Sequence, residues 1–138
     1  MALTVLDAGV VIAILDASDA HHDAAIREVR TAMDRGDDLV VPASAYAEAL
    51  VAPNRRGTAA AATVDAFIDS LPATIEPATR AVAAKAAELR AAHGNQLRLP
   101  DALVVATAMV LGAERVITTD ARWPRTAVRV EVVGPDPG

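Results

Sequence analysis

The chain alternates between short runs of apolar, often β-branched residues and longer segments with helical spacing. Short strands that are each followed by a helix pair in parallel, because the helix carries the chain back to the same edge of the sheet. Parallel strands are buried on both faces, which suits runs that lack polar alternation. The sequence therefore predicts an α/β fold, a three-layer α/β/α sandwich with a mostly parallel five-stranded sheet. The predicted strands are residues 3–6, 39–41, 73–75, 115–118 and 128–132.

Residues that favour helix starts and stops delimit the helical segments. Ser18 or Asp19 is a candidate cap for the second helix, and Pro100 and Asp101 occupy a favoured first turn. The segment Pro53–Gly57 predicts a turn, because proline and glycine interrupt helices. The predicted helices are residues 8–15, 22–35, 45–51, 58–70, 78–93 and 99–111.

Length and composition indicate one domain, since 138 residues with 53% hydrophobic side chains can bury a single core. We expect this domain to span residues 1–133, with 134–138 as a flexible C-terminal tail. The absence of cysteine excludes disulfides and thiolate catalysis. No signal-peptide pattern and no apolar stretch of about 20 residues is present, so we expect a soluble cytoplasmic protein without membrane contact. A net charge of −5 argues against a broad basic nucleic-acid surface but not against a local cation-dependent site.

Four acidic residues interrupt segments that are expected to be buried. Asp7 directly follows the first predicted strand, and Asp120 follows the fourth by two residues, so both are expected at the same edge of a parallel sheet. Asp101 starts an otherwise apolar helix, and Glu48 lies in a run without other charges. Buried carboxylates need a partner, and no Lys or Arg is adjacent to Asp7 or Glu48. Mg²⁺ or Mn²⁺, which prefers oxygen ligands, would satisfy them.

Each acid also has an ordinary structural interpretation when it is taken alone. Asp7 could cap the following helix, and Asp101 could be a favourable acid in a first helical turn. Glu48 could face solvent, and Asp120 could be a turn residue. The shared position of two acids at strand ends favours a common site over four separate explanations.

The chain resembles the PIN-domain nucleases, and among them the VapC toxins of bacterial VapBC toxin–antitoxin pairs. The resemblance extends from residue 3 to about 132 and is most specific in the Pro-Asp-Ala-Leu segment. Two positions depart from the family pattern: Ala8 and Gly9 stand where Ser or Thr often follows the first Asp, and Trp123 stands where Phe often follows the last. The motifs that carry the resemblance are Val5-Leu6-Asp7, Ser44 with Glu48, Leu99-Pro100-Asp101-Ala102-Leu103-Val104-Val105-Ala106-Thr107-Ala108, and Ile117-Thr118-Thr119-Asp120.

This resemblance implies an Mg²⁺- or Mn²⁺-dependent endoribonuclease that cleaves a particular cellular RNA and so inhibits translation. Asp7 and Asp101 become the main metal ligands. Glu48 and Asp120 complete the catalytic acids and hold a second ion or orient water. Ser44 and Thr118 become hydrogen-bonding supports of the ligands.

The implied partners are RNA, a second copy of the chain and a VapB-type antitoxin in a toxin–antitoxin hetero-oligomer. Arginine pairs with phosphate through two hydrogen bonds, and several arginines lie near the acidic segments. Ordinary solvated arginines are the alternative explanation. The candidate RNA-binding residues are Arg55, Arg56, Arg98 and Arg122, with Arg125 nearby in sequence.

Other functions remain open at this point. A receiver domain or a haloacid-dehalogenase-type phosphatase also places an Asp after the first strand, but both need a late lysine, and the only lysine, Lys85, lies inside a predicted helix. A non-catalytic PIN-like module that only binds proteins is the remaining alternative, and the presence of all four acids weighs against it.

Overall fold

The computed structural model describes residues 2–137 and contains one five-stranded sheet. The strand order is β3-β2-β1-β4-β5, and every neighbouring pair is parallel. Val5 in the central strand aligns with Val40 on one side and Val116 on the other. The predicted α/β architecture is therefore confirmed. The strands are β1 (Leu3–Leu6), β2 (Asp38–Pro42), β3 (Ala73–Glu76), β4 (Arg115–Thr118) and β5 (Arg129–Val132).

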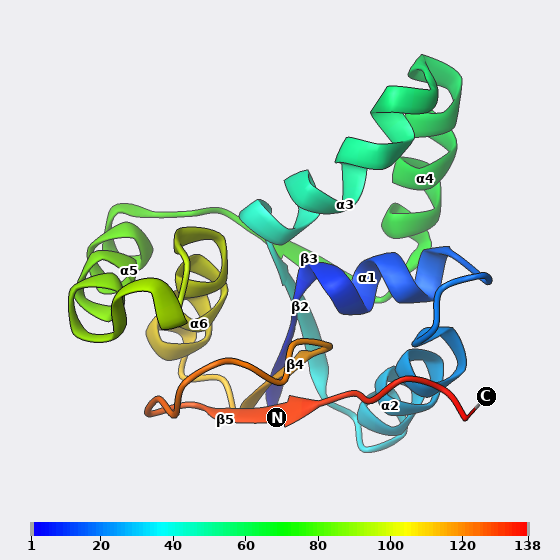
Figure 1. Cartoon of the computed structure of the whole chain (residues 1–138). Helices are drawn as coiled ribbons and strands as arrows, with labels where there is room; N and C mark the ends of the chain where they lie inside the picture. Colours follow the sequence, from blue (N-terminus) through cyan, green and yellow to red (C-terminus); the bar gives the residue numbers. More distant parts are fainter. Residues whose placement is uncertain (1, 138) are drawn as a thin grey trace.

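Helices cover both faces of this sheet (Figure 1). Helices α1 and α2 lie on one side and α5 and α6 on the other, while α3 and α4 project as a hairpin near the ends of β1 and β2. No helix within residues 2–137 is long and apolar enough to cross a membrane. The helices are α1 (Ala8–Leu15), α2 (His22–Asp34), α3 (Ala43–Arg56), α4 (Thr58–Ser70), α5 (Arg80–His93) and α6 (Leu99–Leu111), with the short 3₁₀ helix η1 (Gly94–Gln96) after α5.

The apolar character of α6 follows from its position between two layers. Val104 and Ala108 pack in the main core with the sheet and α1. Ala102 and Val105 face the other way and pack against Val82 and its neighbours on α5. A helix buried on two sides has no polar face, so Asp101 at its start stands out chemically from the rest of the helix.

The predicted turn at Pro53–Gly57 is wrong, because α3 continues through it to Arg56. A proline inside a helix removes one backbone donor, yet α3 continues through Pro53, which is buried. Asn54 adds a bond of its own by donating from Nδ2 to the Leu50 carbonyl at 2.9 Å. The helix ends at Gly57, whose φ of 124° is a conformation that favours glycine.

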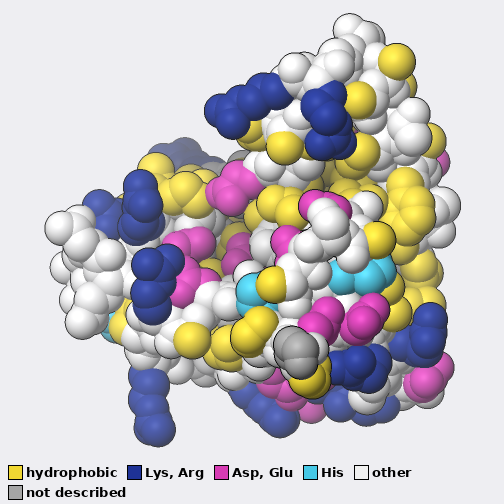
Figure 2. Space-filling view, turned by 45° about the vertical axis from the view of Figure 1, so that its right-hand side comes forward, with side chains coloured by type: hydrophobic (Ala, Val, Ile, Leu, Met, Phe, Trp, Pro, Cys, Tyr) yellow, Lys and Arg dark blue, Asp and Glu magenta, His cyan; other side chains and the backbone are white. Residues whose placement is uncertain are grey.

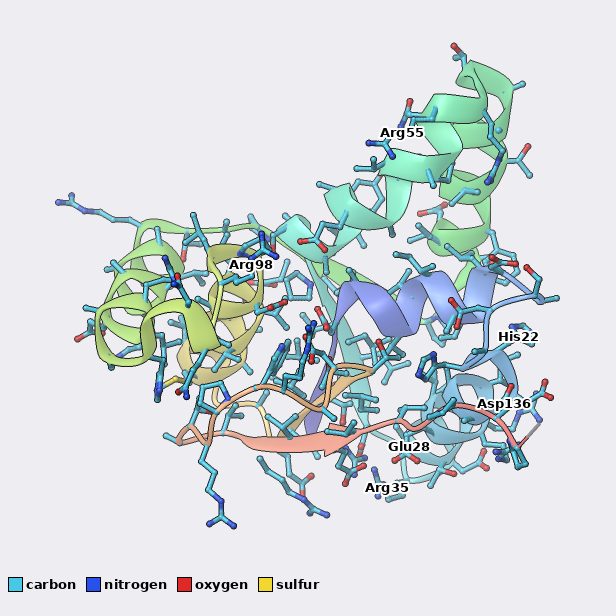
Figure 3. All side chains as sticks on the ribbon, in the orientation of Figure 1. His22, Glu28, Arg35, Arg55, Arg98 and Asp136 are labelled. Atoms are coloured by element: carbon cyan, nitrogen blue, oxygen red, sulfur yellow. The ribbon has the colours of Figure 1, made fainter. Side chains whose placement is uncertain are left out.

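The C-terminal segment, expected to be a flexible tail, contacts the start of α2. The Asp136 carboxylate accepts hydrogen bonds from the backbone N–H groups of Asp23 and Ala24 at 3.0 and 2.8 Å. Asp136 therefore caps α2, the role suggested for Ser18 or Asp19, and Figure 3 shows it beside His22. Gly138, the last residue of the expected tail, lies outside the described residues.

Close packing between α1 and the segment after β4 explains the glycine that follows Asp7. A Cβ added at Gly9 would lie well inside van der Waals contact with the Thr119 hydroxyl oxygen. A side chain at position 9 and the hydroxyl of Thr119 therefore compete for the same space. Gly9 is one of the residues that depart from the family pattern. The space beside it is occupied by the hydroxyl of Thr119, which comes from the segment after β4.

This packing predicts that substitutions at positions 9 and 119 are not additive. In the Thr119→Ala background, Gly9→Ala should stabilise the protein by up to about 1 kcal/mol, because alanine favours helix over glycine. In the parent protein, Gly9→Ala should bring no gain in stability, since the stiff Thr119 side chain must leave its preferred rotamer. Urea unfolding of the four proteins measures the coupling, expected to be about 1 kcal/mol. Additive effects would show that Thr119 moves aside freely.

Candidate acidic site at the carboxyl edge of the sheet

Asp7 lies at the junction of β1 and α1 and is 7% exposed. Its Oδ1 accepts a hydrogen bond from the Ala8 N–H at 2.8 Å, and its Oδ2 accepts one from the Thr118 hydroxyl at 2.7 Å. Asp7 thus caps α1, but two neutral donors do not balance a buried negative charge. Burial accordingly raises the pKa of Asp7, and the charges of Glu48 and Asp120 raise it further, against the opposing effect of the Thr118 and Ala8 bonds.

Thr118 joins Asp7 to Asp120. While its hydroxyl donates to Asp7, the same oxygen accepts a hydrogen bond from the Asp120 backbone N–H at 3.1 Å. The Asp120 carboxylate receives the Arg122 guanidinium, with Nε at 3.1 Å from Oδ1 and Nη2 at 3.3 Å from Oδ2. This arginine holds the pKa of Asp120 below its ordinary value. Arg122, predicted to bind RNA, is therefore already paired with an acid.

Asp101 is half-buried in the first turn of α6. It forms no ion pair within residues 2–137. Burial raises its pKa to about 6, and the negative charges of Asp7 and Asp120 contribute. Nearby Trp123 and Arg98 act in the opposite direction. Asp101 is thus a partly buried carboxyl group that lies near other negative charges and has no ionic partner among the described residues.

Glu48 lies on α3 and remains exposed. Partial desolvation still raises its pKa, and so does the charge of Asp101. Each of the four predicted acids therefore acts electrostatically on at least one of the others. Figure 2 shows acidic side chains gathered in the hollow below the projecting hairpin, with Lys and Arg side chains around it.

The acids share an electrostatic field without forming a closed cluster. Across residues 2–137, no group of three or more His, Asp or Glu side chains is arranged so that it could hold a metal ion. Mutual repulsion opposes closer approach of uncompensated carboxylates. The arrangement is therefore an open acidic edge at which Asp120 alone of the four acids has an ionic partner among the described residues.

The remaining predicted site residues surround this edge. Ser44 lies in the first turn of α3, one turn before Glu48. Arg56 lines a surface hollow of about 400 Å³ together with Glu48. Figure 3 places Arg55 on α3 and Arg98 at the start of α6, both exposed. The structure thus puts Thr118 in contact with two acids, whereas Ser44 makes no hydrogen bond to an acid among the described residues.

Two residues at the site were not predicted for it, Thr119 and Trp123. Thr119 contacts the start of α1 beside Asp7. Trp123 packs against both apolar clusters and lowers the pKa of Asp101. The sequence signal available for Trp123 was its position three residues after Asp120, but that spacing does not indicate which acid it approaches.

Comparisons with known proteins identify the family of this fold. The sequence profile of the PIN domain matches residues 4–129, most of the chain. The chain belongs to the PIN-domain family. The predicted resemblance to PIN domains is therefore confirmed, although a search of curated proteins found no significant match.

Three solved structures are similar to this PIN domain. VapC20 of Mycobacterium tuberculosis, described as a sarcin-ricin loop cleaving toxin, is 22% identical over 82% of this chain and 86% of that chain, with a TM-score of 0.66. A toxin–antitoxin complex from Klebsiella pneumoniae is 17% identical, covering 96% and 99%, with a TM-score of 0.73. VapBC2 of Rickettsia felis, bound to a promoter DNA fragment, is 12% identical, covering 94% and 97%, with a TM-score of 0.76. At these identities the likeness shows the fold.

The raised pKa of Asp101 predicts how the stability of the metal-free PIN domain changes with pH. The folded state holds the Asp101 proton up to about pH 6, whereas an unfolded Asp releases it near 3.8. The contribution of Asp101 to stability is therefore greatest below pH 3.8, the pKa of the unfolded Asp, and is lost as the pH rises through about 6. Asp101→Asn should remove this loss and stabilise the protein at pH 7 by about 1 kcal/mol, after allowance for solvent screening.

Chemical unfolding in EDTA at pH 3.5, 5 and 7 measures the effect. Asp34→Asn, at an exposed acid on α2, is the matched control and should not reproduce it. Parallel stability curves for the parent and Asp101→Asn would contradict the prediction.

Proposed function

We propose that this PIN domain is a VapC-type toxin, an Mg²⁺- or Mn²⁺-dependent endoribonuclease that hydrolyses a specific cellular RNA and so inhibits translation. The observation that carries the proposal is the uncompensated charge of Asp101, which lies in the electrostatic field of Asp7 and Asp120 at one edge of the sheet. Further support comes from the match to the PIN domain over residues 4–129, a range that includes all four acids. An acidic edge of this kind would repel a phosphodiester unless cations bind first.

The chemistry of the donors suits a divalent cation of this type, although the described side chains do not form a closed set of three or more ligands. The four acids offer oxygen ligands, and hard cations such as Mg²⁺ and Mn²⁺ prefer oxygen. Asp7 and Asp101 would be the main ligands, with Glu48 and Asp120 binding a second ion or positioning water. Each Asp7 oxygen accepts one hydrogen bond and keeps a lone pair for a further partner. When bound, such a cation neutralises the phosphate charge and lowers the pKa of its water.

The protein residues then have separate tasks. Thr118 holds Asp7 and the Asp120 backbone in one arrangement, because its single hydroxyl bonds to both. Arg122 restrains Asp120. The buried surroundings of Asp7 exclude bulk water from one side of the edge. Water attack on the phosphorus requires no nucleophilic side chain and no 2′-hydroxyl. With the 3′-oxygen as the leaving group, the expected products carry a 5′-phosphate and a 3′-hydroxyl.

RNA contact is assigned to arginines that border the acids. Arg55 and Arg56 end α3, the helix of Glu48, and Arg98 immediately precedes α6, the helix of Asp101. Positive side chains on two helices would bind phosphates on either side of the cleaved bond. The pairing of Arg122 with Asp120 favours a structural task for Arg122 over phosphate binding.

We also propose that a VapB-type antitoxin and a second copy of the chain are partners. The similar structures from Klebsiella pneumoniae and Rickettsia felis are toxin–antitoxin assemblies. Exposed apolar side chains on three helices support protein contacts, since they lie close to the acidic edge or on the projecting hairpin. These include Ile12 on α1, Val51 on α3 and Phe67 on α4, which are 37%, 46% and 46% exposed.

Loss of either main acid should abolish cleavage without unfolding the protein. Asp7→Asn and Asp101→Asn should each lower RNA cleavage by at least about 100-fold, because each would remove a ligand charge. Cleavage of total bacterial RNA with Mg²⁺, Mn²⁺ or EDTA tests this, and sequencing of the new 5′-phosphate ends identifies the target. Asp34→Asn is the control. Cleavage by the double variant in EDTA would reveal another mechanism, and no cleavage by the parent on any RNA would favour a non-catalytic binding module.

Replacing Arg55 and Arg56 together with Ala should separate RNA binding from chemistry. The variant should need more RNA to reach half its maximal rate, while saturating RNA should restore most of the rate, because the acids are unchanged. Each lost phosphate contact should reduce the salt slope of binding by roughly one. Cleavage against RNA concentration at two salt levels measures both effects, with Arg30→Ala on α2 as control. If the variant behaved like the parent protein, RNA would contact the surface near Arg98 instead of Arg55 and Arg56.

A further inference from the structure

Strand β3 forms one free edge of the parallel sheet. It pairs with β2 alone, in a register that aligns Val40 with Thr74 and Val41 with Ile75. No strand within residues 2–137 lies on its other side, so alternate backbone N–H and C=O groups of β3 have no partner strand. Thr74 and Ile75 are both exposed, although neighbouring side chains of a strand point to opposite faces of the sheet. Strand β3 is therefore accessible at its edge and on both faces.

A hollow lies on each face of β3. On one face, Ala73 and Ile75 line a hollow of about 460 Å³ between β3 and the α3–α4 hairpin. On the other face, Thr74 and Glu76 line a hollow of about 390 Å³ that extends over β2 to Leu3 and Leu111. Successive side chains of a strand alternate between faces. A strand added at this edge would therefore direct its side chains alternately toward the two hollows.

Both hollows are acidic. Asp65 and Asp69, one helical turn apart on α4, line the first hollow, and Asp38 and Glu76 line the second. None of these four acids forms an ion pair within residues 2–137, and no Lys or Arg of that range lines either hollow. The Tyr46 hydroxyl donates to Asp65 at 2.5 Å, but a neutral donor leaves the negative charge in place. The free edge of β3 therefore lies between two sets of uncompensated carboxylates.

This charge selects among the possible occupants of the edge. If the β3 edge of a second copy paired here, the same acids would meet across a two-fold interface and repel each other. RNA phosphates would be repelled in the same way, whereas a cationic polypeptide would be attracted. The opposite edge strand, β5, differs in character, because Arg129 pairs with Glu131 at 3.0 Å and lines the hollow beside that strand together with Arg125.

We propose that β3 is a docking edge for an extended, cationic segment of a partner protein, which adds to the sheet as a further strand. Backbone hydrogen bonds to β3 hold the segment, and its Lys or Arg side chains reach the acids of both hollows. The aliphatic stems of these side chains pack on Ile75, which is 37% exposed. Pro72 and Pro77 flank β3 and lack backbone donors, so pairing is confined to the four residues of the strand. The proposal goes beyond the nuclease function and does not depend on it, because none of these residues belongs to the acidic site.

The docking edge can be tested on the full chain with two synthetic peptides, Arg-Val-Arg-Val-Arg-Val and Val-Arg-Val-Arg-Val-Arg, which cover both facings of the arginines. In a ¹H–¹⁵N titration, at least one peptide should shift the backbone amides of Thr74, Ile75 and Glu76 and slow their hydrogen exchange. The same peptides with Glu in place of Arg should not bind, because the acids repel them. Versions N-methylated at every residue keep the side chains but lose the backbone donors, and they should not bind either.

A charge reversal at one hollow tests whether the acids contribute. Asp69→Lys should weaken binding of the Arg–Val peptide by about 5-fold or more, because a surface attraction becomes a repulsion. Asp69 is exposed on α4, so this change should leave the fold intact, which circular dichroism checks. Glu88→Lys, at an exposed acid on α5, carries the same change of net charge and should bind like the parent protein. Equal weakening by both variants would indicate a non-specific charge effect and overturn the proposal.

The remaining outcomes separate the possible occupants. If neither Arg–Val peptide shifts the β3 amides, the edge is not a docking site for cationic segments. If the N-methylated peptides bind as tightly as the unmodified ones, the segment does not add as a strand. If the β3 amides shift with protein concentration in the absence of peptide and sedimentation shows dimers, the edge pairs with a second copy. Each of these three results would overturn the proposal and leave the proposed nuclease function untouched.

Discussion

A buried carboxylate at the end of the central strand is the constraint on which the acidic edge depends. Asp7 cannot move toward solvent, because it follows β1 directly and caps α1 through Ala8. Its charge is met by a hydroxyl and a backbone N–H, which are neutral donors. The negative charge of any other acid at this edge is therefore repelled by the Asp7 carboxylate, whose position is fixed. Burial raises the pKa of Asp101, and the charge of Asp7 raises it further, while the pKa of Glu48 is raised by burial and by the charge of Asp101.

The opposite end of the same sheet shows that this imbalance is not a general feature of the fold. Arg115 begins β4 and is 2% exposed, yet its Nη2 lies 2.6 Å from Asp37 and its Nη1 lies 3.1 Å from Glu131. Its Nε also donates to the Thr4 hydroxyl at 3.2 Å. Buried charge is thus paired at the amino end and left unpaired at the carboxyl end. Since an unpaired buried charge costs stability, its retention at one end supports a binding role there.

The sequence predicts the parts of the fold that depend on local pattern, and its errors concern contacts between distant segments. The five strands and the acids at their ends follow from apolar periodicity and parallel topology. Local rules predicted a turn at Pro53, but α3 continues through this buried proline to Arg56. The cap of α2 comes from Asp136, more than a hundred residues away, so a search for nearby caps could not find it. The approach of Trp123 to Asp101 likewise depends on how α6 packs.

Concentrating the supporting donors in one short segment has a mechanical consequence. Thr118 lies at the end of a fully buried strand, so its position is fixed by the sheet. Arg122 and Trp123 follow within five residues and act on acids from two different elements. A displacement of this segment would therefore disturb Asp7 and Asp120 together, because Thr118 and Arg122 donate to them. Asp101 and Glu48 lie instead on α6 and α3, and α3 is the helix that also carries Arg55 and Arg56.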